Sequence, residues 1–262
     1  MFIFVGIIFA ILFFVITYAG KHLSLSGAIL MSAVIVFFVL FRLWNLLILL
    51  LVAYSVLMVV DKLTRKKRKA IDSNILQKTG TRTGIQVFAN GFSALLSVVL
   101  YITTKESMFL IVYAVGIGVT FTDSIASDIG VLSKRAPRDI CTLKKITPGL
   151  SGGVSLFGII ASVSTSILYG SMAYFCICIS FEEVLIIVVF SLLGSIIDSL
   201  LGSLMQAKYQ CSVCGIHTEK KLHCDMPTKH TVGFCQIDNC MVNFLSNIIV
   251  CALCALFLIW RM

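Results

Sequence analysis

The stretch with the clearest chemical character is KKITPGLSGGVSLFG, which runs from Lys144 to Gly158. Two lysines and a proline precede Gly149, Gly152 and Gly153, and an apolar run typical of a membrane helix follows. A glycine-rich turn lets backbone N–H groups converge, and the start of a helix adds free N–H groups and a partial positive charge. These features predict an anion site, for which phosphate is the usual ligand. The alternative is that Pro and Gly only end a loop where a helix begins.

Carboxylates lie at or near the ends of several apolar segments. Asp198 recurs at four-residue spacing with Gly194, Gly202 and Gln206, which places all four on one face of a helix. A carboxylate within a membrane is costly and tends to mark a functional site. Beside a phosphate site, carboxylates typically hold Mg²⁺, and phosphoryl transfer needs a metal, cations and backbone donors around the moving group. We therefore expect Mg²⁺ on two or more of Asp123, Asp128, Asp198 and Asp238, and catalytic roles for Asp123, Asp198 and Lys145.

Amide side chains follow the same pattern near the same helix ends. Gln86 and Asn90 lie one helical turn apart, as do Asn239 and Asn243. Interhelical hydrogen bonding is the alternative explanation for such amides. The predicted substrate- and phosphate-binding residues are Lys144, Gly149, Ser151, Gly152, Gly153, Ser155, Gln86, Asn90, Gln206, Asn239 and Asn243.

The elements that must position these residues are membrane helices. The chain is 59% hydrophobic and 13% charged with a mean hydropathy of +1.03, values that exclude an ordinary soluble domain. We expect residues 1–262 to form a single all-α integral membrane domain, a helical bundle of about 7–8 spans. The candidate spans are Phe2 to Ala19, Leu25 to Phe41, Leu43 to Val60, Gly84 to Ile102, Met108 to Phe121, Val154 to Ile177, Val184 to Met205, and Cys240 to Trp260.

The distribution of basic residues predicts the orientation in the membrane. With eight spans, 18 of the 21 Lys and Arg residues fall on one side. The positive-inside rule makes that side cytosolic and explains the net charge of +9 without nucleic acid. Residues 61–83, 122–152 and 206–239 are then cytosolic loops (basic, Asp/Gly-rich and Cys/His-rich), and both termini face away from the cytosol. The run from Lys62 to Lys69 is a topology anchor or, alternatively, binds acidic lipid headgroups.

The Cys/His-rich segment has the composition of a zinc site. Cys211 and Cys214 have standard ligand spacing, whereas His223 and Cys224 are adjacent, which is poor ligand geometry. The alternative is a set of reduced, unpaired cysteines in a reducing compartment. Zn²⁺ on Cys211, Cys214, His223 and Cys224 is therefore one of two interpretations.

Several ordered motifs together resemble the transmembrane protein 19 family, also called the integral membrane domain of unknown function 92. These motifs are LSLSGA, RTGIQVFANG, TDSIASDIG, TPGLSGGVSLFG, GSIIDSLLGSLMQ and DNCMVNFLSN. The resemblance implies a polytopic α-helical protein, and plant members include phytyl-phosphate kinase, which makes phytyl diphosphate with a nucleoside triphosphate. This chain departs from many members at Ser124, Asp128 and Leu150, which replace Thr, Glu and a loop Thr.

Taken with the resemblance, these residues favour a membrane lipid-phosphate kinase that uses a nucleoside triphosphate and Mg²⁺ on an isoprenoid monophosphate. Membrane lipids and that substrate are the expected partners, and no protein partner is implied. The alternative is a multi-pass transporter or channel, because intramembrane Asp and Asn residues also line solute paths. The depth of the polar residues distinguishes the two, since a transport path crosses the whole bilayer.

Overall fold

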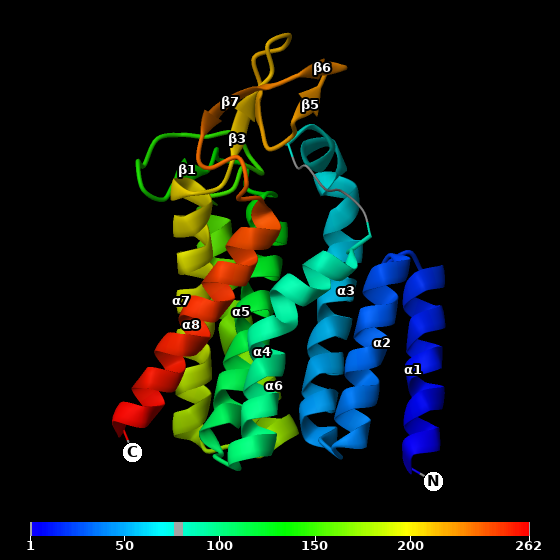
Figure 1. The fold of residues 1–262 in the computed structure, drawn as a ribbon. Helices are drawn as coiled ribbons and strands as arrows, with labels where there is room; N and C mark the ends of the chain where they lie inside the picture. The colour runs from blue at the N-terminus through cyan, green and yellow to red at the C-terminus, as the bar shows by residue number, and fades with distance from the viewer. Residues whose placement is uncertain (1, 76–80, 262) are drawn as a thin grey trace.

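The computed structural model describes residues 2–75 and 81–261. Within these residues the chain forms eight helices that run side by side as a bundle, with both ends of the chain at the same end of it (Figure 1). Six of these helices are long and apolar enough to cross a membrane, and α1 and α2 are shorter apolar helices. The helices are α1 (Phe2–Ala19), α2 (Leu25–Leu40), α3 (Trp44–Ile75), α4 (Gly84–Thr104), α5 (Met108–Gly130), α6 (Leu156–Ile177), α7 (Phe181–Leu204) and α8 (Asn239–Arg261). The predicted all-α membrane fold is confirmed.

Two helices are longer than the sequence predicted. The expected basic loop 61–83 is helical as far as Ile75, and residues 76–80 of it lie outside the described residues. Likewise, α5 continues to Gly130, so Asp123 and Asp128 lie on a helix and not in a loop. The predicted boundaries were placed where hydrophobicity ends, but Lys, Arg and Ala are strong helix formers, and a helix continues into water without difficulty.

Hydroxyl side chains begin four of the helices. Ser24 accepts a hydrogen bond from Gly27 N at the start of α2, and Ser155 accepts one from Gly158 N at the start of α6. Thr83 and Gln86 form a capping box at α4, as Ser180 and Glu183 do at α7. These caps satisfy backbone donors that have no partner within the helix.

The central helix of the bundle is α5, which packs against α3, α4, α6, α7 and α8. Small residues allow these close contacts. A Cβ built at Gly194 of α7 would lie 2.4 Å from Val119 Cγ2, and one at Gly116 of α5 would lie 3.1 Å from Ala94 Cβ. Close approach at small residues is the usual way for helices to pack in a membrane, where the hydrophobic effect does not drive association.

Short strands form at the end of the bundle opposite the chain ends (Figure 1). Strand β1 (Arg138–Asp139) pairs with β2 (Gly153–Val154), which places β1 beside the Gly153–Val154 part of the glycine-rich segment. The expected Cys/His-rich loop folds into two small sheets. In these, β3 (Lys208–Gln210) pairs with β4 (His217–Thr218) and β7 (Lys229–Val232), and β5 (Leu222–His223) pairs with β6 (Met226–Pro227).

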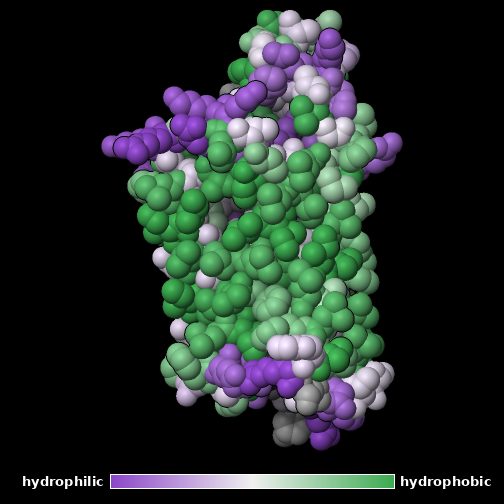
Figure 2. All heavy atoms as spheres, turned by 90° about the vertical axis from the view of Figure 1, so that its left-hand side faces the viewer, coloured by the Kyte–Doolittle hydropathy of each residue, from purple (hydrophilic) through white to green (hydrophobic). Residues whose placement is uncertain are grey.

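The surface has the polarity expected of a membrane protein. On the face drawn in Figure 2, a broad hydrophobic band covers the helices, and hydrophilic residues gather at the two ends. The large side chains exposed on the helices include Phe4, Leu25, Phe88, Ile160 and Phe175. Lipid is the environment in which such a surface is stable.

Candidate functional site

A cavity of about 610 Å³ lies at the end of the bundle that carries the strands, and it gathers most of the predicted site residues. Its walls come from α3, α4, α5, α6, α7 and α8, from the glycine-rich segment and from the Cys/His-rich segment. The predicted residues that line it are Gln86, Asn90, Asp123, Asp128, Gly149, Ser151, Gly152, Gly153, Ser155, Asp198, Gln206, Asp238, Asn239 and Asn243.

Two of the four predicted metal-binding aspartates face the cavity from membrane helices with only neutral partners. Ser195 Oγ donates to Asp123 Oδ1 at 3.3 Å, and Ser246 Oγ donates to Asp198 Oδ2 at 2.9 Å. Neither carboxylate has an ion-pair partner within residues 2–75 and 81–261. Both carboxylates line the same cavity. Such a pair suits a divalent cation, which would neutralise both charges.

The other two predicted metal-binding aspartates are engaged in structural contacts. Asp128 forms an ion pair with Arg68 Nη1, and Arg68 Nη2 lies 2.6 Å from Asp61 Oδ1. Asp238 Oδ1 accepts a hydrogen bond from Met241 N at 3.1 Å, at the start of α8. Arg68 belongs to the basic run, but its side chain is only 11% exposed, so it faces the bundle and not a lipid headgroup.

The amides divide into two groups. With its amide nitrogen facing Asp198, Asn243 donates to Asp198 Oδ2 at 3.2 Å and to Asn239 O at 3.0 Å. Asn247, one turn further along, is buried and bonds Ser93 Oγ at 2.7 Å on α4. Interhelical bonding therefore accounts for Asn247, while Asn243 positions a carboxylate at the cavity.

Two residues expected to bind substrate are helix caps. Gln86 Oε1 accepts from Thr83 N at 2.8 Å, which completes the capping box of α4. Ser155 Oγ donates to Gly130 O at 3.1 Å and accepts from Gly158 N at 3.1 Å. Both line the cavity, but these hydrogen bonds already serve the fold.

The glycine-rich loop lies directly against the last turn of α7. Gly152 has φ +83°, and a Cβ there would lie 2.6 Å from Ser203 Cα and 2.6 Å from Ser203 N. A Cβ at Gly202 would in turn meet Gly152 N at 3.0 Å. Only glycine combines this backbone conformation with this close approach.

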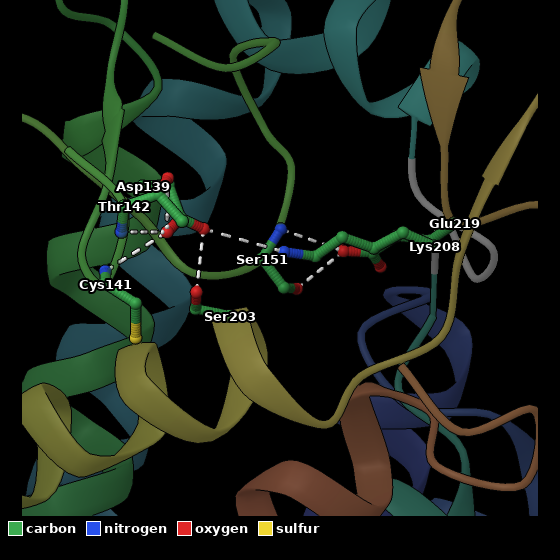
Figure 3. Close-up of polar contacts among 7 residues, drawn as sticks. All are labelled: Asp139, Cys141, Thr142, Ser151, Ser203, Lys208 and Glu219. Carbon is green, nitrogen blue, oxygen red and sulfur yellow. Dashed lines mark hydrogen bonds and ion pairs between the residues drawn. The ribbon is translucent and has the colours of Figure 1, made fainter. Parts of the chain in front are cut away.

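Donors of this loop bind a carboxyl group that belongs to the chain itself. Ser151 N and Ser151 Oγ donate to Glu219 Oε1 at 3.0 and 2.5 Å (Figure 3). The Glu219 side chain is only 5% exposed. Burial raises the pKa of Glu219, although the bonds from Ser151 and the charge of Lys208 act in the opposite direction. The sequence reasoning missed Glu219 because it lies in the Cys/His-rich segment, far from the loop along the chain.

Asp139, also unpredicted, joins the loop to α7 and β3 (Figure 3). It accepts hydrogen bonds from Thr142 N at 2.8 Å, Cys141 N at 3.1 Å and Ser203 Oγ at 2.8 Å. Burial opposes ionisation, but these bonds outweigh it, so the pKa of Asp139 is lowered. The ammonium of Lys208 lies 3.9 Å from Asp139 Oδ2, and burial lowers the pKa of Lys208.

The cations at the cavity are not the predicted ones. Lys144 and Lys145 are exposed and do not line it, because they lie on the hairpin that joins β1 to the loop. Arg68, Arg82 and Lys221 line it instead, and neither Arg82 nor Lys221 has a carboxylate partner among the described residues.

Arg82 is held in place by the turn between α1 and α2. Ser24 N donates to Arg82 O at 3.0 Å, and Arg82 N donates to His22 O at 3.2 Å. A Cβ at Gly27 would lie 2.6 Å from Arg82 O. The motifs LSLSGA and RTGIQVFANG therefore form one structural unit, a relation that the sequence does not reveal.

An apolar groove of about 120 Å³ adjoins the cavity. It runs between α2, α3, α4 and α5, and its lining includes Met31, Phe88 and Tyr113. The groove and the cavity share Arg82, Gln86 and Asn90, so a hydrocarbon space and a polar space meet at these residues.

The four predicted zinc ligands also come together, at a separate position outside the cavity lining.

Comparison with known proteins agrees with this architecture. The sequence profile of the family described as integral membrane protein DUF92 matches residues 8–251. The chain is 30% identical to "Protein PGR" of Arabidopsis thaliana, over 88% of this chain and 87% of that protein. It is 29% identical to "Uncharacterized membrane protein MJ0933" of Methanocaldococcus jannaschii, over 70% of this chain and 73% of that protein. No solved structure matches. The resemblance seen in the sequence motifs is thus confirmed, and the chain belongs to the integral membrane protein DUF92 family.

Proposed function

We propose that the protein is a membrane lipid-phosphate kinase. It would transfer a phosphoryl group from a nucleoside triphosphate to an isoprenoid monophosphate of the phytyl phosphate type. In that reaction a phosphate oxygen of the lipid attacks the terminal phosphorus of the nucleotide. The bond from that phosphorus to the bridging oxygen breaks, and the nucleoside diphosphate leaves with that oxygen.

The observation that carries the proposal is the junction of the apolar groove with the polar cavity. A lipid phosphate needs a hydrocarbon space and a cationic polar space that touch, and these two spaces share Arg82, Gln86 and Asn90. Arg82 is the cation at the junction. A guanidinium matches the geometry of phosphate oxygens, so Arg82 is the residue expected to receive the lipid phosphate.

The remaining wall of the cavity suits a nucleotide with its metal. Asp123 and Asp198 are the residues that would hold Mg²⁺, which would neutralise negative charge on the phosphates. Lys221 also lines the cavity and would supply a further cation. Gln206 is 1% exposed, and its Oε1 has no hydrogen-bond partner among the described residues, so it can accept from a hydroxyl or amino group. Phosphoryl transfer depends mainly on such positioning and charge.

We also propose that the end with the cavity faces the cytosol. The 18 Lys and Arg residues assigned to that side support this orientation, as does the need of the site for a cytosolic nucleotide. Both termini then lie on the other side, since they lie at the opposite end of the bundle (Figure 1).

The test is a kinase assay on purified protein in detergent. Phytyl, farnesyl and geranylgeranyl monophosphates are offered with Mg²⁺ and each nucleoside triphosphate, and the diphosphate is measured. We expect Asp198→Asn to lower the rate on the order of 100-fold or more, because a metal ligand is lost while the amide oxygen still accepts from Ser246. The matched control is Glu182→Gln at the other end of α7, where Glu182 is paired with Arg261.

Two outcomes contradict the proposal. Folded protein that forms no diphosphate with any pair of substrates rules out this kinase activity and directs attention to solute uptake in liposomes. Equal activity of Asp198→Asn and the wild type removes Asp198 from the mechanism.

A further inference from the structure

A cluster outside the cavity carries an inference that does not depend on the kinase reaction. Cys211 directly follows β3, and Cys214 lies in the turn that leads to β4. His223 ends β5, and Cys224 lies in the turn that leads to β6. The tips of two hairpins therefore meet, and each contributes two side chains that can bind a metal.

The four ligand atoms already have the spacing of a metal site. The three sulfur atoms and the imidazole nitrogen all lie within 4.8 Å of one another. His223 Nδ1 lies 3.5 Å from Cys214 Sγ and 3.2 Å from Cys224 Sγ. A tetrahedral zinc ion, with bonds of about 2.3 Å to sulfur and about 2.0 Å to nitrogen, separates its ligands by roughly 3.5–3.8 Å. The observed separations, from 3.2 Å to at most 4.8 Å, bracket this range, so side-chain shifts of about 1 Å or less give a closed site with three cysteines and one histidine.

The backbone explains how two adjacent residues can bind the same ion. Cys224 and Asp225 both have positive φ, 51° and 58°, as a two-residue hairpin turn requires. Asn and Gly are the usual residues in such a turn, and a Cys there is unfavourable without a further interaction. The left-handed conformation turns Cys224 back toward the ring of His223, so the adjacent spacing does not prevent shared ligation.

The ligand set is specific within the chain. Among the described residues, no other group of three or more His, Cys, Asp or Glu side chains lies close enough to hold a metal ion. His217 and Cys235, which lie in the same segment, are not part of the group. Three sulfur atoms and one imidazole favour zinc over magnesium or calcium, which prefer oxygen ligands.

The site also has a structural consequence. Glu219 and Lys221, which line the cavity, lie between the two pairs of ligands along the chain. This part of the segment is attached to α3, because Glu219 N and Thr218 Oγ1 donate to Ile75 O at 2.8 and 2.9 Å. Two small sheets without a core of their own need such a crosslink to keep one shape.

We propose that Cys211, Cys214, His223 and Cys224 bind one structural Zn²⁺. The ion would join the two hairpins and hold the segment between them, which carries Glu219, at the cavity. The experiment uses the full-length protein, purified in detergent under reducing conditions with its affinity tag removed. Metal content is measured by mass spectrometry. We expect about one zinc ion per chain, and close to none in Cys211→Ser/Cys214→Ser. The matched control is Cys141→Ser, an exposed cysteine outside the cluster, which should keep its zinc.

A second measurement does not depend on whether the double variant folds. Wild-type protein is treated with a zinc chelator and then followed by hydrogen exchange. Loss of zinc should increase exchange within residues 208–232 and leave the membrane helices unchanged. Replacement by Co²⁺ should give the absorption bands of tetrahedral thiolate coordination. Folded wild-type protein without zinc, or zinc retained in the double variant, overturns the proposal.

Discussion

Gly152 is the position where a single methyl group should do the most damage to the candidate site. Its φ of +83° costs a non-glycine residue about 1–2 kcal/mol. The new Cβ would also lie 2.6 Å from Ser203 Cα, about 0.8 Å short of the 3.4 Å at which ordinary contact begins. Because the obstacle is backbone, no side chain can turn away to make room. We therefore expect Gly152→Ala to push the loop off the last turn of α7.

Two assays measure this displacement. The backbone cost alone should lower the apparent melting temperature in detergent by roughly 2–8 °C. A shift of about 1 Å in a reacting site lowers the rate by about 100-fold, so diphosphate formation should fall by at least that much. The matched control for the melting assay is Gly91→Ala in α4, where a Cβ meets no atom of the described residues within 4 Å. Because Gly91 lines the apolar groove, this variant does not serve as a control for activity. Because Ala is the better helix former, this control should melt at the same temperature or slightly higher.

The comparison of the two variants separates a general glycine effect from the contact with α7. Gly152→Ala that melts together with the wild type and keeps its activity would show that the loop does not lie against Ser203. Equal destabilisation of both variants would mean that the loss of glycine itself matters, and the steric argument would then be wrong.

Three further predictions concern the charges around the loop. Asp139→Ala should lower the free energy of unfolding by about 3–5 kcal/mol, because the buried Lys208 loses its ion-pair partner. Ser203→Ala removes only one hydrogen bond to Asp139 and should lower it by about 1.5–3 kcal/mol. Chemical denaturation measures both changes. Folding raises the pKa of Glu219 above its ordinary value of 4.5, so the folded protein keeps a proton there that the unfolded chain has lost. The wild type therefore loses stability as the pH rises from 4.5 through the pKa of the folded state. The stability of Glu219→Gln relative to the wild type should therefore rise with pH across that window, as melting curves at several pH values can measure. A difference in melting temperature between the two proteins that stays constant with pH would contradict this prediction. Arg82→Gln should raise the KM for the lipid phosphate about 10- to 100-fold, which is the loss expected when a charged hydrogen bond is removed. Lys144→Gln lies outside the cavity lining and should leave this KM unchanged. The reverse result would favour Lys144, the cation predicted from the sequence.

The sequence was most informative about the membrane helices. Hydrophobicity located each of the eight helices, because a span must be apolar over most of its length. It was less informative about where helices end outside the membrane. The basic run after Val60 carries no hydrophobic signal, yet α3 continues through it and brings Arg68 to Asp128.

The candidate site was predictable where it lies on helices. Four-residue spacing correctly placed Asp198 on a helix face, and Asp198 lines the cavity. The rest of that pattern was only partly right. Gln206 lines the cavity from beyond the end of α7 at Leu204, whereas Gly194 and Gly202 are packing positions outside the lining. The contributions of Glu219 and Asp139 were not predictable, because both lie in segments without periodicity. Their contacts depend on how short strands and loops fold over the end of the bundle, which spacing along the chain does not encode.

In the glycine-rich loop, the donors that predicted a phosphate site make contacts within the chain. Its N–H groups favour an anion, and in this structure Ser151 N and Oγ bind the carboxylate of Glu219. We therefore expect a substrate phosphate to bind instead at Arg82 and Lys221, neither of which has a carboxylate partner among the described residues. We infer that the loop has a structural role and connects two parts of the cavity wall. It contacts Glu219 through Ser151 and the end of α7 through Gly152. In this way it would set the distance between the carboxylates on the helices, such as Asp198, and the cations on the surrounding segments, such as Lys221.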